Sequence, residues 1–128
     1  VVRREPPVWE RTLETIRTLL VRVKSGECST ERAVSELTDI VRRYLETRFR
    51  LRATRQTTAE FLRALGRDDR ILSSEDRKFL RSFLESADMV KFARLPAEPD
   101  LLENAAHHAE SLVLASVPRD EEKKGGAS

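Results

Sequence analysis

The fold of this chain is decided by TTAEFLRALGRDDRILSSEDRKFLRSFLESADMVKFARL, residues 57–95, which predicts two capped helices followed by a short apolar segment. Thr57 stands three residues before Glu60, so its hydroxyl and the carboxylate can each pair with a backbone amide at the start of a helix. Ser73 and Asp76 repeat this spacing less ideally. The arrangement is typical of a helical docking module and not of a catalytic loop.

A dense apolar segment follows the second of these helices and ends just before Pro96. Its apolar residues are Met89, Val90, Phe92, Ala93 and Leu95. Such density predicts burial, either in the core or against a partner. We expect Phe92 to lie in the core, because the two neighbouring helices have few other large residues to cover them. Trp9 admits the same two interpretations, and we expect a core role there too.

Apolar stripes at helical spacing predict a helical hairpin before this stretch. The first helix opens at Pro6 and Pro7, ends at Gly26 and carries an apolar stripe formed by Trp9, Leu13, Ile16, Leu20 and Val23. The second helix is capped by Ser29 or Thr30 and has a core face formed by Ala33, Leu37, Ile40, Val41, Tyr44 and Leu45. Because the connection is so short, the two helices are expected to pack antiparallel.

Helical periodicity is lost in residues 48–56, where apolar residues alternate with arginines, so a short strand or a loop is expected there. The third helix is predicted over about residues 58–65 and the fourth over about 74–87, with Phe79, Leu80, Phe83 and Leu84 facing inward. A fifth helix ends before Pro118 and carries Leu101, Leu102, Ala105, Ala106, Ala109, Leu112 and Val113.

These elements predict an all-α fold, a compact bundle of about five helices that begins with an antiparallel helical hairpin. The length of 128 residues suits one domain with one core. We expect a flexible or membrane-proximal lead over residues 1–7, a single helical domain over residues 8–117 and a disordered tail over residues 118–128.

The composition excludes several classes of protein. Cys28 is the only cysteine, so neither an intramolecular disulfide nor a cysteine-built zinc site can form. No apolar run exceeds four residues, and no signal-peptide hydrophobic region opens the chain, so these residues neither span a membrane nor direct export. The sequence starts with VVRR and not with Met. One interpretation is a piece of a longer polypeptide with Arg3 and Arg4 beside a membrane helix, and the simpler one is Met removal or an arbitrary boundary.

No catalytic, metal or cofactor site is predicted. His107 and His108 are adjacent on a helix and about 100° apart, so they cannot face one metal ion. Carboxylates are plentiful but lie among arginines on polar faces, as is typical of solvated ion pairs. Neither a Gly-rich phosphate loop nor a serine nucleophile elbow occurs in the sequence. We therefore predict that the chain is not an enzyme and has no cofactor.

The candidate interaction surface is an arginine segment with a local charge of +5 over fourteen positions. It contains Arg42, Arg43, Arg48, Arg50, Arg52 and Arg55, with Glu46 as the one acid. Such a charge attracts the phosphates of lipids or nucleic acids. The chain has 19 Arg against 5 Lys, so a solvated surface is the first interpretation, an acidic membrane surface the second and nucleic acid the third.

Four blocks of this sequence, taken in order, resemble a known family. They are the opening Pro6-Pro7, VRRYLETRF at residues 41–49, TTAE at residues 57–60 and LESADMVKFA at residues 84–93. Together they resemble the cytoplasmic domain of BatD-like and related single-pass bacterial membrane proteins, which are encoded beside MoxR-type AAA+ ATPases and von Willebrand A-domain proteins. The resemblance covers roughly residues 6–117.

The resemblance implies a non-enzymatic interaction or assembly module on the cytoplasmic face of the bacterial inner membrane, engaging a MoxR-type ATPase or a von Willebrand A-domain partner. It carries over no active-site residues, and it departs at Arg50, where such sequences often have glycine. The rival hypothesis is a helical nucleic-acid-binding domain that uses residues 42–55. Six further residues are expected to be structural: Trp9, Tyr44, Thr57, Glu60, Phe83 and Phe92.

Overall fold

The computed structural model describes residues 5–51, 55–67 and 72–118, and it confirms the all-α fold. Five helices lie in these ranges: α1 Val8–Lys24, α2 Thr30–Phe49, α3 Thr58–Gly66, α4 Ser74–Phe92 and α5 Pro99–Ala115. No strand occurs within the described ranges, so the segment after α2 is a loop there. The predicted disordered tail lies, apart from Pro118, outside the described residues, as do the first four residues of the predicted lead.

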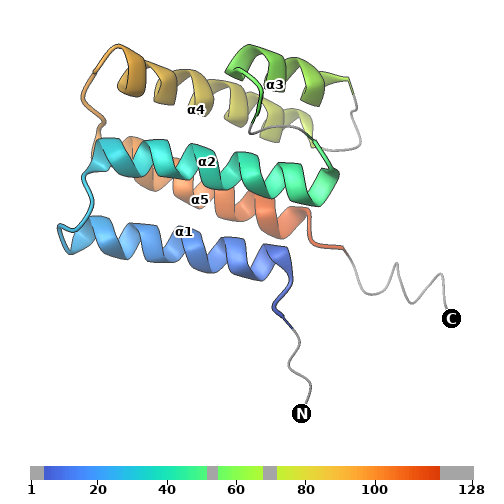
Figure 1. Ribbon diagram of the computed structural model, residues 1–128, viewed down its shortest axis with the longest axis horizontal. Helices are drawn as coiled ribbons and strands as arrows, with labels where there is room; N and C mark the ends of the chain where they lie inside the picture. Colours follow the sequence, from blue (N-terminus) through green and yellow to red (C-terminus); the bar gives the residue numbers. More distant parts are fainter. Residues whose placement is uncertain (1–4, 52–54, 68–71, 119–128) are drawn as a thin grey trace, which may run out of the picture.

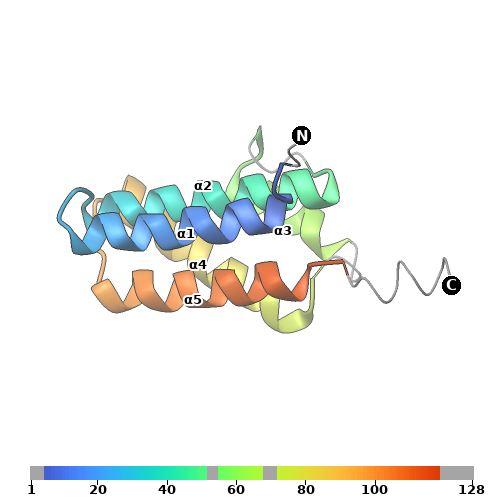
Figure 2. The same ribbon diagram turned by 90° about the horizontal axis from the view of Figure 1, so that it is seen from below.

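Helices α1, α2, α4 and α5 pack together as a bundle, in which α2 contacts α1, α4 and α5 (Figure 1). α1 and α2 make an antiparallel hairpin, and α5 packs against both of them (Figure 2). α4 packs against α2 and α5, and α3 lies on α4. The start of α1 and the end of α5 lie at the same end of the bundle (Figure 1).

The core is built from the inward faces of all five helices. α2 buries Ala33, Val34, Leu37, Val41, Tyr44 and Leu45, while α5 buries Leu102, Ala105, Ala106, Ala109, Leu112 and Val113. The small alanines on α5 let its backbone approach its neighbours closely. In α1 the fully buried leucine is Leu19, whereas Leu20 is half-buried at the edge of the core. Trp9 is half-buried and packs against the core, and Phe83 is buried within it.

Local capping fixes where several helices begin. The Thr57 hydroxyl accepts a hydrogen bond from the Glu60 amide at 3.1 Å, and the Glu60 carboxylate accepts one from the Thr57 amide at 2.9 Å. Both halves of the predicted capping box are therefore present at the start of α3. At the start of α4 the Ser73 hydroxyl accepts from the Asp76 amide at 3.1 Å.

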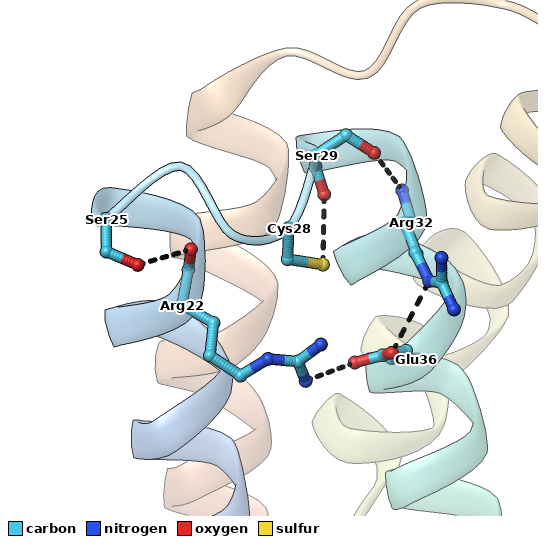
Figure 3. A network of polar contacts seen from close by, with 6 residues as sticks. All are labelled: Arg22, Ser25, Cys28, Ser29, Arg32 and Glu36. Atoms are coloured by element: carbon cyan, nitrogen blue, oxygen red, sulfur yellow. Dashed lines mark hydrogen bonds and ion pairs between the residues drawn. The ribbon is translucent and has the colours of Figure 1, made fainter.

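The connection between α1 and α2 is a compact turn (Figure 3). Gly26 has φ +84°, a left-handed conformation that glycine adopts without steric cost. Ser29 then caps α2, because its hydroxyl accepts from the Arg32 amide at 3.1 Å. Below the turn, Arg22 pairs with Glu36 at 3.0 Å and so links the two helices of the hairpin (Figure 3).

The end of α2 differs from the sequence expectation. The helix continues through Phe49, so the lost periodicity at residues 48–49 does not mark a loop. Arg50 follows in the left-handed conformation, with φ 57° and ψ 42°, and its amide donates to the Glu46 carbonyl. The position that resembles a glycine site therefore has the backbone geometry that glycine favours.

The end of α4 contradicts the prediction for Phe92. The helix runs to Phe92 and not to Ala87, and Phe92 is 72% exposed. Since each residue turns a helix by about 100°, Phe92 lies roughly 140° around the axis from buried Ala87. The expected core role for Phe92 is therefore wrong, because continued helical periodicity carries its side chain out of the core.

Arg50→Gly is expected to raise the free energy of unfolding by about 0.5–1 kcal/mol, because glycine relieves the clash of a Cβ atom in the left-handed region. Urea denaturation followed by circular dichroism measures this change. Arg50→Ala is the matched control, since it removes the charge but keeps the Cβ. Equal stability of the glycine and alanine variants would contradict a strained backbone at this position.

Glu31→Gln is expected to weaken the link between α2 and the loop after α4 at neutral pH. The Glu31 carboxylate accepts a hydrogen bond from the Ala97 amide at 3.0 Å, and this bond lowers the pKa of Glu31. A carboxyl with a lowered pKa stabilises the fold above its ordinary pKa, and this stability is lost as the pH falls through the folded value.

Urea denaturation across a pH series tests this prediction. The stability difference between parent and Glu31→Gln should be present at neutral pH and should shrink as the pH falls below about 4. Glu14→Gln, at an exposed position on α1, is the control for loss of a surface charge. A Glu31→Gln difference that stays constant with pH would exclude the ionised hydrogen bond as its source.

Candidate interaction groove between helices α2 and α4

The arginine segment does not form one continuous binding surface, because two of its members support the fold. Arg42 donates to the Gln56 carbonyl at 2.8 Å and to the Thr58 hydroxyl at 2.7 Å. Its guanidinium also lies over the Phe61 ring, 5.4 Å from the centroid. Arg42 thereby ties α2 to the start of α3.

Arg48 supports the opposite side of the same helix. Its Nε and Nη2 atoms donate to the Ser116 carbonyl at 3.1 and 3.0 Å, at the C-terminal end of α5, where a positive charge is favourable. The buried Tyr44 hydroxyl bonds to the Ser116 hydroxyl, which in turn bonds to the Val113 carbonyl. Together Tyr44 and Arg48 fasten the end of α5 to α2.

The remaining four arginines of the segment are either exposed or outside the described residues. Arg43, Arg50 and Arg55 are exposed, and Arg52 lies outside the described residues. The part of the predicted surface that is free to meet a partner is therefore smaller than the local charge of +5 suggests. Each such arginine contributes little on its own to the binding of a charged partner at physiological salt.

His108 supports the fold, whereas His107 is exposed. His108 stacks on Phe79 with ring centroids 4.0 Å apart and an interplanar angle of 9°. Its Nε2 atom lies 3.4 Å from an Asp76 carboxylate oxygen, so it joins α5 to α4. Among the described residues, no group of three or more His, Cys, Asp or Glu side chains is placed to hold a metal ion.

A groove of about 500 Å³ lies between α2 and α4. It exists because α3 has nine residues and α4 has nineteen, so α3 spans only about half of the length of α4. Its walls are Ser35, Thr38, Asp39, Arg42 and Arg43 from α2 and Ala87, Asp88, Lys91 and Phe92 from α4. Gln56, Thr57 and Thr58, at the start of α3, complete the lining.

The polar groups of this groove are incompletely paired. Within the part of the chain that the structure describes, neither Asp39 nor Asp88 has an ion pair with a cationic side chain. The Oε1 atom of Gln56 is buried and has no hydrogen-bond donor there. Buried polar atoms are nearly always paired in folded proteins, so Gln56 Oε1 is the unsatisfied atom of this wall, whereas Asp39 is exposed and Asp88 is half-buried.

Three large apolar residues are exposed near the C-terminal end of α4. They are Met89, Phe92 and Leu95, with 51%, 72% and 46% of each residue accessible to solvent. Of these, Phe92 lines the groove, whereas Met89 lines a separate hollow on α4. Met89 and Phe92 are three positions apart on α4 and therefore lie on neighbouring parts of one helix face. The Lys91 ammonium lies 5.2 Å from the Phe92 ring centroid. Aromatic side chains of this kind are enriched where proteins bind one another.

The sequence signal for these exposed residues is their apolar density, which predicts burial in the core or against a partner. Only Phe92 was expected in the core, and it is exposed. The groove itself has no local sequence signal, because its walls come from helices that are far apart in the chain.

Comparison with known proteins adds no relative: no family model, no curated protein and no solved structure matches this chain. Among the described residues, no helix has both the length and the apolar character needed to cross a membrane. The fold and the groove therefore define the class of this protein as an all-α helical bundle with an open polar groove and an exposed aromatic rim.

Phe92→Ala and Phe83→Ala are expected to differ sharply in stability. Phe83 is buried in the core, so its truncation should lower the free energy of unfolding by about 3–5 kcal/mol. Exposed Phe92 should change it by less than about 0.5 kcal/mol. Urea midpoints of the two variants and the parent decide between these values. A loss at Phe92 that approaches the loss at Phe83 would place Phe92 in the core after all.

Proposed function

We propose that this chain is a non-enzymatic interaction module and that it binds a protein partner in the groove between α2 and α4. The observation that carries the proposal is the 72% exposure of Phe92 at the rim of this groove. Burying a phenylalanine ring contributes about 1.5–3 kcal/mol, so an aromatic ring that the fold leaves in water is available for association. The groove beside it offers a concave surface with polar groups for specificity.

The family resemblance supports this location of the binding site. Three of the blocks that carry it contribute to the groove: RRYLE supplies Arg42 and Arg43, TTAE supplies Thr57 and Thr58, and ADMVKFA supplies Ala87, Asp88, Lys91 and Phe92. A MoxR-type ATPase or a von Willebrand A-domain protein is accordingly the partner we propose. The same resemblance supports attachment of the domain to the cytoplasmic face of the bacterial inner membrane.

The exposed arginines fit a second, weaker contact in such an anchored protein. Arg43, Arg50 and Arg55 would face acidic lipid, where each suitably placed arginine adds about 1 kcal/mol. The rival function, nucleic-acid binding by residues 42–55, uses the same side chains. It has less to build on, because Arg42 and Arg48 make hydrogen bonds within the fold.

The test is recovery of partners with the full-length protein from membranes of its own bacterium, after nuclease treatment in one half of the sample. The parent should recover a MoxR-type ATPase or a von Willebrand A-domain protein, and Phe92→Ser should reduce that recovery at least tenfold. Val21→Ser is the matched control, because Val21 is another exposed apolar residue, on α1, with 63% of its surface accessible.

Two outcomes would overturn the proposal. Equal recovery by parent and Phe92→Ser would exclude the groove rim as the binding site. Recovery of nucleic acid in its place, lost when Arg43, Arg50 and Arg55 are changed to Ser, would favour the rival function.

A further inference from the structure

We infer that a hollow between α1 and α2 binds the phosphate of an anionic phospholipid, an inference that rests on the membrane attachment proposed above and concerns a site other than the groove. This α1–α2 hollow has a volume of about 280 Å³. Among its described lining residues, the charged ones are Arg11 from α1 and Arg43 from α2, and both are exposed. Neither forms an ion pair with any side chain in the described ranges.

The charges of the α1–α2 hollow therefore select an anion. Two like charges that face one hollow from different helices repel each other, and an anion between them replaces this repulsion by attraction. Each guanidinium can pair with phosphate oxygens through two parallel N–H donors. The Thr12 and Thr15 hydroxyls already donate to the Val8 and Arg11 carbonyls, both at 2.7 Å, so Thr47 is the lining threonine whose hydroxyl can donate to the ligand.

The rest of the lining suits the carbon atoms that a lipid headgroup carries beside its phosphate. Val8 and Ile40 are half-buried and pack against the core. The buried Tyr44 also lines the hollow, and its hydroxyl is bonded to Ser116. These apolar surfaces would contact the glycerol carbons of a phospholipid, whereas inorganic phosphate would leave them in water.

The α1–α2 hollow lies at the end of the bundle that an anchored domain would turn toward the membrane. It is lined by Val8, the first residue of α1, and by Thr47, two positions before the last residue of α2. The start of α1 and the end of α2 lie side by side (Figure 1, Figure 2). Exposed Arg50 follows directly after α2. Basic residues close to a membrane attachment point are attracted to anionic headgroups, so the lipid is the source of phosphate to which the position of the hollow points.

Other ligand classes fit the α1–α2 hollow less well. Its described lining offers no carboxylate, so a calcium or magnesium ion lacks the ligands it needs. Glu14 and Glu36 line the next hollow along the hairpin, where Glu36 pairs with Arg22 at 3.0 Å. The one lining aromatic, Tyr44, is buried, so a nucleic-acid base has no exposed ring there on which to stack.

The test combines vesicle binding with a nuclear magnetic resonance titration of the ¹⁵N-labelled chain. We expect the chain to sediment with vesicles of equal parts phosphatidylglycerol and phosphatidylcholine, and not with pure phosphatidylcholine, at about 0.1 M salt. Soluble dihexanoylphosphatidylglycerol should shift the amide signals of Arg11, Arg43 and Thr47 and should bind tighter than inorganic phosphate, the probe of the second arm.

The diagnostic variant is Arg11→Gln, because Arg43 also lines the groove between α2 and α4. It should bind the mixed vesicles about fivefold more weakly, which is the effect of one arginine at an anionic surface. Lys24→Gln is the matched control, because Lys24 is an exposed cation at the opposite end of α1. It should leave vesicle binding unchanged.

Three outcomes would overturn this inference. One is an equal loss of vesicle binding in Arg11→Gln and Lys24→Gln, which would make net charge its source. The second is equal sedimentation with both kinds of vesicle. The third is a shift of the same signals by inorganic phosphate without binding to the mixed vesicles, which would make the ligand a soluble phosphate. The groove is judged separately, by recovery of the partner with Phe92→Ser, and membrane attachment by fractionation of the full-length protein.

Discussion

The burial of the inward face of α2 is the constraint on which the rest of this structure depends, because α2 packs against α1, α4 and α5. α5 likewise packs against three helices, α1, α2 and α4. The alanines of α5 allow close approach, and Leu37, Val41 and Leu45 of α2 are almost entirely buried. Full burial of one such side chain contributes about 1.5–3 kcal/mol, so the buried face of α2 contributes substantially to the stability of the domain. The Ser116 contacts with Tyr44 and Arg48 then hold the two helix ends together.

The groove follows from the position and the short length of α3. α3 packs on α4, and hydrogen bonds of Arg42 join its start to α2. Because it is so short, it covers one part of α4 and leaves the other part open beside α2. The same stretch of sequence thus completes the fold at one end of α4 and exposes Phe92 at the other. The proposed binding site lies beside the part of α4 that α3 leaves uncovered.

Local features of the fold could be predicted from the sequence. The Thr57–Glu60 capping box and the glycine turn at Gly26 depend on residues within a few positions of one another, and both occur as predicted. The cap of α2 is Ser29, one of the two residues predicted for it. The antiparallel hairpin follows from its short connection. The end of α4 was predicted too early, at Ala87, although no residue between Ala87 and Phe92 breaks a helix, and Phe92 was expected in the core.

The candidate site was much less predictable, because its parts meet only in the tertiary structure. Arg42 and Arg48 look like surface cations in the sequence, yet their partners lie 14 to 68 residues away. The groove requires α2 and α4 to be neighbours and α3 to be short, and counting charges cannot show either. The exposed apolar residues were visible in the sequence, but their direction depends on where α4 ends.

The central claim is that Phe92 stands in solvent beside an open groove and becomes covered when a partner binds. Fluorine NMR of the chain labelled with 4-fluorophenylalanine tests it directly, with a soluble gadolinium chelate as the probe of solvent contact. In the free protein the Phe92 signal should broaden strongly with the chelate while the buried Phe83 signal should not, and a bound partner segment should protect Phe92 alone. A Phe92 signal that is protected in the free protein, or that stays exposed in the complex, would contradict the account.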